Sequence, residues 1–267
     1  MSRICIVGHQ GMLGHLLKNY FGDLGHECLH VTKRYSVAEA EVWFDELLQL
    51  EPEWVINCAS ISIKSEIPKQ MQWEVNFSLP FLLAKALPDG VGLIQASSDA
   101  VFPSRGGDPY WAEDPLNPED DYGLAKKMAE ESITRPYHFI IRSCLIGPEQ
   151  KGAQNLLSWT LAQGESFSGY SNHRFNGITT LQWAKLAERI MKGEFPVQKL
   201  LQPATDPAIS LFDLMHQIRN TWNAPATINE IKSPEPLNRI LISNVEVPYI
   251  QEQLTELYHW MNKPILS

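Results

Sequence analysis

Tyr122 and Lys126 form the pair of residues whose types and spacing point most directly to chemistry. Among the eight tyrosines, only Tyr122 is followed four residues later by a lysine, in "DYGLAKK". On a helix, this spacing places both side chains on one face, one turn apart. A nearby ammonium favours the phenolate form, so such a tyrosine can give a proton to a ketone oxygen or take one from an alcohol. Taken alone, the pair is better explained as a surface contact within a helix.

Two consecutive serines, Ser97 and Ser98, follow an apolar run in "QASSDAVF". In an open parallel sheet, ligands bind at the carboxyl ends of the strands. If the apolar run is such a strand, the hydroxyl of Ser98 lies where it can hydrogen-bond the same substrate oxygen as Tyr122. A serine here also suits a helix cap or a turn, so its position alone leaves both roles open.

Three glycines, Gly8, Gly11 and Gly14, stand in "GHQGMLG" between an apolar run and an amphipathic segment. In a dinucleotide-binding loop, the first glycine allows the turn out of a strand, and the second lets the backbone approach a pyrophosphate. The third allows close packing of the helix on the sheet. The start of that helix offers free N–H groups to the phosphates. The placement favours a dinucleotide site over a glycine turn without a ligand.

The segment "HVTKRYS", residues 30–36, indicates which dinucleotide is preferred. A site for NAD usually has Asp or Glu about 20 residues beyond the glycines. Here Lys33 and Arg34 stand instead, and a cationic side chain suits the 2′-phosphate of NADPH. The sequence therefore favours NADPH, with NADH as the alternative. If no ligand binds here, Lys33 and Arg34 belong to a solvated basic loop at the end of a strand.

The elements that must position these residues alternate between strands and helices through the first half of the chain. Short apolar runs predict strands, and apolar residues at helical spacing predict helices between them. The expected strands cover residues 3–8, 26–31, 54–60, 91–98 and 138–147. The expected helices cover residues 13–21, 40–48, 79–86 and 122–133. Because parallel strands need right-handed crossovers, this alternation predicts a doubly wound parallel α/β sheet of the Rossmann type.

The second half of the chain is less regular. We expect helices over 177–193, over 211–222 with Ser210 as the N-cap, and over 247–261. Short strands are expected within 197–202 and 239–243. We therefore expect a dinucleotide-binding domain over about 1–149 and a smaller C-terminal substrate lobe over 150–267, with some segments returning to the sheet and a cleft between the two.

The composition excludes some classes of protein. The 267 residues carry a formal net charge of −9, which argues against a general binder of nucleic acid or of membrane surfaces. The four cysteines form no CxxC pair and no metal-ligand spacing, so we expect buried free thiols and no metal site. The N-terminus has no signal-peptide pattern and no apolar run is long enough to span a membrane, which favours a soluble cytoplasmic protein.

The three motifs together resemble the extended short-chain dehydrogenases/reductases, and within them the dTDP-4-dehydrorhamnose reductase branch. "GHQGMLG" is similar to the glycine motif of that branch, "SSDAVF" to its "STDYVF", and "YGLAK" to its "YGxxK". "VINCAS" resembles its "VINAAA", and "EVN", ending at Asn76, resembles a helix element that it shares. The sequence departs from the pattern at Ala100, where the branch has tyrosine, and at Ser104, where it has glycine. The resemblance covers the first half well and the second half weakly.

The resemblance implies roles for individual residues. Tyr122 would be the proton donor, Lys126 would bind the nicotinamide ribose and tune Tyr122, and Ser98 would be the third catalytic residue. Cys58, Ala59 and Ser60 would line the ribose and nicotinamide side of the cofactor. The residues that would hold the pyrophosphate, through glycines or backbone contacts, are Gly8, Gln10, Gly11, Met12, Leu13 and Gly14.

A nucleotide-sugar substrate needs its own contacts. Arg174 and Arg239 can bind a diphosphate through paired hydrogen bonds, and Lys64, Asn155 and Asn176 are further candidates together with Ser98. Each of these residues, taken singly, is also explained as an ordinary polar surface residue.

The sequence therefore predicts an NADPH-dependent reductase of a nucleotide-linked keto-sugar, with a 4-keto-6-deoxy hexose as the expected substrate. Two alternatives stay open: an epimerase that retains and recycles NAD⁺, and a regulatory subunit that binds the cofactor without turnover. The complete set of Ser98, Tyr122 and Lys126 argues against the regulatory subunit. A homodimer is compatible with the sequence.

Overall fold

A computed structural model describes residues 1–62, 66–104, 108–197 and 199–263. The chain divides into two compact units, and neither is continuous in sequence. The first contains residues 1–103, 115–142 and 184–201, and the second contains 104–114, 143–183 and 202–267. Segment 184–201 thus belongs to the same unit as most of the first half of the chain. The division into a dinucleotide-binding domain over 1–149 and a substrate lobe over 150–267 stays a prediction.

The first unit is built on a six-stranded parallel sheet, which confirms the predicted doubly wound α/β fold. Its strand order is β10-β5-β4-β3-β1-β2, and every neighbouring pair is parallel. The strands are β1 (Arg3–Val7), β2 (Glu27–Leu29), β3 (Trp54–Asn57), β4 (Gly92–Ser97), β5 (His138–Arg142) and β10 (Leu200–Leu201).

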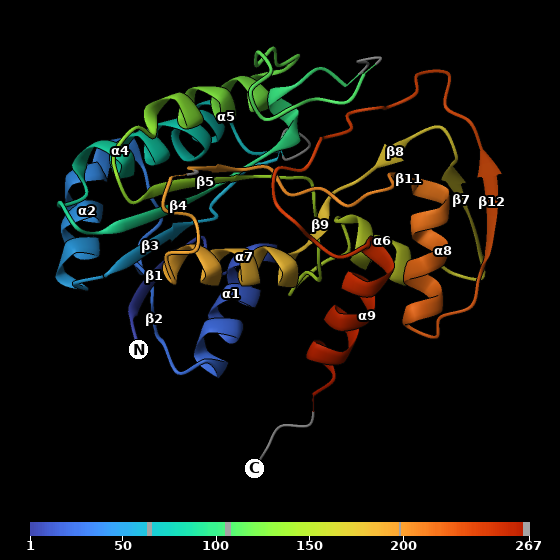
Figure 1. The fold of residues 1–267 in the computed structure, drawn as a ribbon, viewed down its shortest axis with the longest axis horizontal. Helices are drawn as coiled ribbons and strands as arrows, with labels where there is room; N and C mark the ends of the chain where they lie inside the picture. The colour runs from blue at the N-terminus through green and yellow to red at the C-terminus, as the bar shows by residue number, and fades with distance from the viewer. Residues whose placement is uncertain (63–65, 105–107, 198, 264–267) are drawn as a thin grey trace. The chain divides into compact units, whose positions relative to one another are not determined.

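Helices cover both faces of this sheet. Figure 1 shows α2, α4 and α5 on one face, and α1 with the C-terminal part of α7 on the other. The long helical segment before β4 is α3, a π-helical turn η2 and α4 in succession. The bounds are α1 (Met12–Asp23), α2 (Ala40–Gln49), α3 (Lys69–Trp73), η2 (Glu74–Ser78), α4 (Leu79–Ala86), α5 (Asp121–Ser132) and α7 (Thr180–Met191), with short 3-10 turns η1 (Val37–Glu39) and η3 (Asp99–Val101).

The core of this unit follows from the alternation of side chains along the strands. Successive strand residues point to opposite faces, so Cys5, Val55 and Leu93 face the same side of adjacent strands. They form one buried cluster with Leu47 of α2 and Leu83 of α4. The alternate strand residues are buried as well, which explains why these strands are apolar throughout rather than alternating in polarity.

Where the structure describes it, the second unit contains three two-stranded sheets and three helices. Strand β6 (Leu145–Ile146) pairs with β9 (Ile178–Thr179), and β7 (Ser166–Tyr170) pairs with β12 (Thr227–Ile231), both in parallel. Strand β8 (Arg174–Phe175) pairs with β11 (Ile209–Ser210) in the antiparallel direction. The helices are α6 (Leu156–Ala162), α8 (Leu211–Thr221) and α9 (Ile250–Met261). Ser210 is the N-cap of α8, as predicted, and its hydroxyl accepts from the amide of Asp213 at 3.0 Å.

Several predicted elements differ from the structure in where they begin or end, or in whether they form. The strand expected over 138–147 ends at Arg142, and Leu145–Ile146 pairs with β9 instead of continuing the large sheet. The helix expected over 177–193 begins only at Thr180, because the two preceding residues form β9. Residues 239–243 make a single bridge, between Leu241 and Tyr110, and no strand.

The four cysteines are free, as predicted, but only Cys5 is buried, while Cys28, Cys58 and Cys144 are partly exposed. In the part of the chain that the structure describes, the helices lack the combination of length and apolar character that crossing a membrane requires.

Candidate active site

The glycine loop joins β1 to α1, as the sequence predicted. Gly11 is the N-cap of α1, and its amide donates to the carbonyl of Gly8 at 2.9 Å. No side chain caps this helix, and its first turn carries no acidic residue. The glycine loop thus leads directly into the start of α1, where backbone N–H groups and the helix dipole favour a phosphate.

Two of the three glycines are required by the fold itself. Gly8 has a φ of +88°, which side chains rarely tolerate, and a Cβ on Gly14 would lie 2.1 Å from the carbonyl oxygen of Gly8. A Cβ on Gly11 would lie 3.3 Å from that same oxygen, a tight but adjustable contact. The conformation and packing of the loop thus explain why residues 8 and 14 are glycine, but they explain glycine at position 11 less fully. A ligand that lies close to the backbone at Gly11 would explain the glycine there.

The glycine loop lies at the point where the strand order reverses, because β1 has β2 on one side and β3 on the other. A Cβ on Gly8 would lie 2.6 Å from the amide nitrogen of Ala59, so the loop after β3 packs directly on the glycine loop. Cys58 adds to this contact, with its thiol donating to the carbonyl of Val7 at 3.1 Å. Ligands of open α/β sheets bind at this reversal point, so Cys58 and Ala59 lie where a cofactor contact was predicted.

Burial raises the pKa of the Cys58 thiol to about 12. The thiol is therefore protonated at neutral pH and lacks the thiolate character of a nucleophile. The contact of Cys58 with the cofactor stays a prediction.

Tyr122 and Lys126 lie on one face of α5, as their spacing predicted. The Lys126 ammonium is 5.7 Å from the centroid of the Tyr122 ring, and it donates to the carbonyl of Ala96 at 3.3 Å. Lys126 is 3% exposed, and among the described residues no carboxylate pairs with it. An ammonium has three donors and is costly to bury without partners. The donors not directed at Ala96 suit oxygen atoms of a ligand, such as ribose hydroxyls.

Gly123 brings the start of α5 onto the loop after β4. A Cβ at this position would lie 2.2 Å from the carbonyl oxygen of Ala100, so only glycine allows the approach. Asp120 caps the helix by accepting from the Gly123 amide at 2.7 Å. Gly123 stands in the "YGLAK" motif but had no predicted role. A glycine directly after the candidate catalytic tyrosine was the sequence signal that could have indicated this close approach.

Ser98 is the N-cap of η3, which α5 contacts. Its hydroxyl oxygen accepts from the amide of Ala100 at 3.2 Å, and its proton is donated to Asp99 Oδ1 at 3.1 Å. The capping role that the sequence left open is therefore real. A catalytic role for Ser98, which stays a prediction, requires this hydroxyl to turn from Asp99 to a substrate oxygen.

Asn76, a residue without an assigned role in the sequence analysis, connects the loop after β3 to the pocket at Tyr122. It lies in the π-helical turn η2, and such turns are frequent at functional sites. Its buried side chain accepts from the amide of Ile61 at 3.0 Å and from the Ser60 hydroxyl at 3.2 Å. Asn76 and Tyr122 line the same pocket, together with Trp73. The structure thus brings Ser60 to the vicinity of Tyr122.

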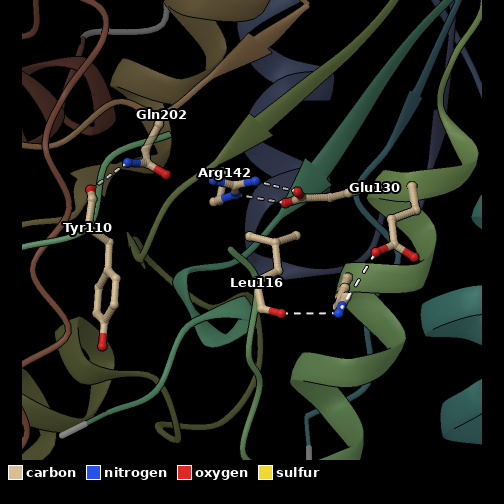
Figure 2. Close-up of polar contacts among 7 residues, drawn as sticks. Tyr110, Leu116, Glu130, Arg142 and Gln202 are labelled. Carbon is tan, nitrogen blue, oxygen red and sulfur yellow. Dashed lines mark hydrogen bonds and ion pairs between the residues drawn. The ribbon is translucent and has the colours of Figure 1, made fainter. Parts of the chain in front are cut away.

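A buried ion pair anchors the helix that carries Tyr122 and Lys126. Arg142 of β5 donates to both carboxylate oxygens of Glu130, at 3.0 and 2.6 Å (Figure 2). Both side chains are almost fully buried, and the Arg142 guanidinium lies 5.1 Å from the centroid of the Phe102 ring. Because Glu130 is one turn beyond Lys126, this pair fixes the position of α5 along its axis.

Lys33 and Arg34 follow β2 and have exposed side chains. The carbonyl of Lys33 accepts from Trp43 Nε1 at 3.1 Å, which fixes the backbone of this segment. The nearby acid, Glu46 of α2, accepts from the amide and the hydroxyl of Thr32 at 2.7 and 2.6 Å. These hydrogen bonds lower the pKa of Glu46. The two cations are thus available to an anion, and their role toward a 2′-phosphate stays a prediction.

The predicted substrate residues fall into three groups. Lys64 lies outside the described residues. Asn155 precedes α6, and its amide donates to Glu149 Oε2 at 3.1 Å. Arg174, Asn176 and Arg239 lie on two neighbouring segments of the second unit, which are joined by the hydrogen bond from the Arg174 amide to the carbonyl of Leu237 at 2.8 Å.

The side chains of two of these residues already have structural contacts. Arg174 donates to the carbonyl of Ala208. The Asn176 amide group donates to the carbonyl of Leu241 at 2.7 Å and accepts from its N–H at 3.2 Å. A substrate contact by any of these residues stays a prediction.

The parallel sheet, the glycine loop at the strand reversal and the tyrosine–lysine pair define a Rossmann-type protein of the extended short-chain dehydrogenase/reductase class. Residues 2–265 match the family described as RmlD substrate binding domain, and the chain belongs to that family. The resemblance to the dTDP-4-dehydrorhamnose reductase branch is thereby confirmed.

Named relatives and solved structures agree with this assignment. The chain is 26% identical over 256 residues to a probable dTDP-4,6-dihydroxy-2-methyloxan-3-one 4-ketoreductase of Streptomyces antibioticus, covering 88% of this chain and 84% of that protein. It is 26% identical over 137 residues to the spore coat polysaccharide biosynthesis protein SpsK of Bacillus subtilis (strain 168), but that match covers only 50% of this chain and 48% of SpsK.

A crystal structure of dTDP-4-dehydrorhamnose reductase from Bacillus anthracis str. Ames, in complex with NADP, superposes with a TM-score of 0.84 at 18% identity. The match covers 98% of this chain and all of that one. At this identity the likeness bears on the fold alone.

Proposed function

We propose that this protein is an NADPH-dependent reductase of a nucleotide-linked keto-sugar, with a 4-keto-6-deoxy hexose as the substrate. The observation that carries the proposal is the buried Lys126 ammonium, 5.7 Å from the Tyr122 ring and hydrogen-bonded to the Ala96 carbonyl. A buried charge without a carboxylate partner among the described residues is costly. A regulatory subunit that only bound the cofactor would use Lys126 for the ribose, but it would gain nothing from the tyrosine hydroxyl beside it.

The residues present fit a dinucleotide. The cradle is formed by Gly8 and Gly14, whose missing side chains leave the loop close to the first amides of α1. Gln10, Met12 and Leu13 would contribute backbone contacts to the pyrophosphate around Gly11. Lys126 would bind the nicotinamide ribose, and Lys33 and Arg34 would meet the 2′-phosphate. The relative crystallised with NADP supports this choice of cofactor.

The chemistry is the reduction of a ketone to an alcohol. When bound, NADPH supplies the hydride to the carbonyl carbon. Tyr122 donates its phenolic proton to the carbonyl oxygen, and the positive charge of Lys126 stabilises the phenolate that remains. Ser98 holds the carbonyl oxygen by a hydrogen bond once its hydroxyl has turned from Asp99. Glu130 and Arg142 keep α5 in the position that these contacts need.

The names of the relatives support the substrate class. The Streptomyces antibioticus protein is named as a 4-ketoreductase of a dTDP-linked compound, and the match spans most of both chains. On this chain, Arg174 and Arg239 are the proposed diphosphate contacts, with Lys64, Asn155 and Asn176 as further candidates. We also place the reaction in the cytoplasm, where free cysteines such as the four seen here persist. Association into a homodimer stays a prediction.

Oxidation of NADPH by the purified protein, measured by absorbance with a panel of nucleotide-linked 4-keto-6-deoxy hexoses, tests the proposal. We expect stoichiometric oxidation with at least one member of the panel, and its loss in Tyr122→Phe. Conversion of the sugar without added cofactor would indicate an epimerase with retained NAD⁺. Cofactor binding without conversion of any member would favour a regulatory subunit.

A further inference from the structure

Two histidines meet at the edge of the site where the adenosine half of a dinucleotide would lie. His9 follows Gly8 in the glycine loop, and His30 is the first residue after β2. Their ring centroids are 4.0 Å apart, with an angle of 36° between the rings, and both side chains are partly exposed. Because β1 and β2 are parallel neighbours, the pair bridges the carboxyl ends of these two strands.

The position of His30 is informative. In dinucleotide-binding folds, the end of the second strand carries the residue that reads the 2′ position of the adenosine ribose, an acid for NAD. This chain has an imidazole there, packed against a second imidazole from the phosphate-binding loop. Neither histidine has a role in the predicted set of site residues, which assigned the 2′-phosphate to Lys33 and Arg34.

The charged groups around the pair come from three neighbouring segments. Lys18 of α1 acts on His9, Glu46 of α2 acts on His30, and Lys33 follows β2 beside Glu46. Glu46 is already engaged by Thr32. A positive charge on His9 is opposed by Lys18, whereas the carboxylate of Glu46 acts on His30.

We propose that His9 and His30 together read the 2′-phosphate of NADPH and take up a proton when it binds. The inference rests on the proposed use of NADPH and names the residues that select it. A neutral imidazole offers one N–H donor, whereas an imidazolium offers two and carries the charge that a phosphate dianion favours. NADH has a hydroxyl at the same position and provides no such charge.

The direction of the proton uptake follows from the surroundings of His9. Burial, and then the like charges of His30 and Lys18, hold the pKa of His9 below its ordinary value of 6.5 in the free protein. A bound phosphate is an opposite charge and raises the pKa again. His9 is thus neutral in the free protein near pH 7 and gains a proton in the complex.

Linkage turns this uptake into a measurable pH dependence. For one proton taken up on binding, the affinity rises by up to about tenfold for each unit by which pH falls. We expect the affinity for NADP⁺ to increase by about three- to tenfold per unit between about pH 8 and about pH 6.5. Protonation of the phosphate itself, with a pKa near 6, acts in the opposite direction and cannot produce this increase.

Titration calorimetry on the full chain tests the proposal, with NADP⁺ and NAD⁺ as ligands across this pH range. Two phosphate-free buffers with different ionisation enthalpies report the number of protons taken up. We expect uptake with NADP⁺ and none with NAD⁺ in the parent protein. The variant His9→Gln/His30→Gln should bind NADP⁺ with a flat pH dependence and no uptake, while His259→Gln, at an exposed position of α9 in the second unit, should behave as the parent.

A further variant separates the histidines from the other candidate cations. Lys33→Ala/Arg34→Ala removes two positive charges and keeps both imidazoles, so it should weaken NADP⁺ binding by a similar factor at every pH and leave the slope unchanged. Two results would overturn the role of the histidine pair and leave the proposed function standing. One is NADP⁺ binding without pH dependence in the parent, and the other is an unchanged pH dependence of the affinity in the double histidine variant. Failure of the parent to bind either dinucleotide overturns the proposed function together with it.

Discussion

Substitution of two glycines of the same loop, Gly11→Ala and Gly14→Ala, should separate cofactor binding from folding. The Cβ of Gly14→Ala would lie 2.1 Å from the carbonyl oxygen of Gly8 and 2.7 Å from His9 Cα, both backbone atoms that cannot swing aside. The helix must therefore move away from the loop. We expect a loss of about 3 kcal/mol in the free energy of unfolding, the upper end of typical overpacking costs.

Gly11→Ala should behave differently, because its Cβ would meet a single atom of the fold at 3.3 Å. A shift of a few tenths of an ångström relieves this contact, and alanine at an N-cap costs up to about 1 kcal/mol relative to glycine. The free energy of unfolding should stay within about 1 kcal/mol of the parent. The new methyl group points at the predicted path of the pyrophosphate, so NADP⁺ affinity should fall by about tenfold or more, or about 1.4 kcal/mol.

Urea unfolding and NADP⁺ titration of both variants provide the two readouts. Gly22→Ala is the matched control, since it lies in the same helix and its Cβ would meet no atom within 4 Å. It should bind NADP⁺ as the parent does and gain up to about 1 kcal/mol in stability. Parent-like NADP⁺ affinity in Gly11→Ala, or parent-like stability in Gly14→Ala, would refute the reasoning.

Three further outcomes are expected. Tyr122→Phe should lower kcat by about 10²- to 10⁴-fold with NADP⁺ affinity unchanged in a binding titration, and full activity would place the proton donor elsewhere. Glu130→Gln leaves the buried Arg142 guanidinium without its counter-ion, so urea unfolding should report a loss of about 3–5 kcal/mol; a loss under 1 kcal/mol would show the pair to be dispensable. Burial, reinforced by neighbouring positive charges, lowers the pKa of His138 to about 4 from its ordinary 6.5, so the unfolded chain binds the proton more readily. Stability should therefore fall as pH drops from 6.5 towards 4, and His138→Gln should show a shallower fall in unfolding experiments across this range.

The parallel sheet was predictable because its strands are short, apolar and separated by helices with regular apolar spacing. The glycine loop and the Tyr122–Lys126 pair were predictable for a related reason, since their spacing in sequence fixes their spacing on one element. The break after Arg142 was not visible, because Leu145 and Ile146 continue the apolar pattern while pairing with a different partner strand. Periodicity reports burial and does not report which strand a segment pairs with.

The contacts that complete the site join segments far apart in sequence. Gly123 packs on Ala100, Asn76 holds Ser60 and Ile61, and His9 meets His30. None of these pairs has a spacing that local structure would impose. The two-residue strands of the second unit were missed because they carry no periodicity. The five-residue strands β7 and β12 were missed because most of their residues are exposed or only partly buried.

Transfer of deuterium from NADPH that carries deuterium at both C4 positions of the nicotinamide tests the central claim most directly. The purified protein is incubated with labelled NADPH and a nucleotide-linked 4-keto-6-deoxy hexose, and the sugar product is analysed by mass spectrometry. The account predicts one deuterium on the former carbonyl carbon of the product and one NADPH consumed for each sugar reduced. A product without deuterium, or conversion of the sugar without consumption of NADPH, would contradict it.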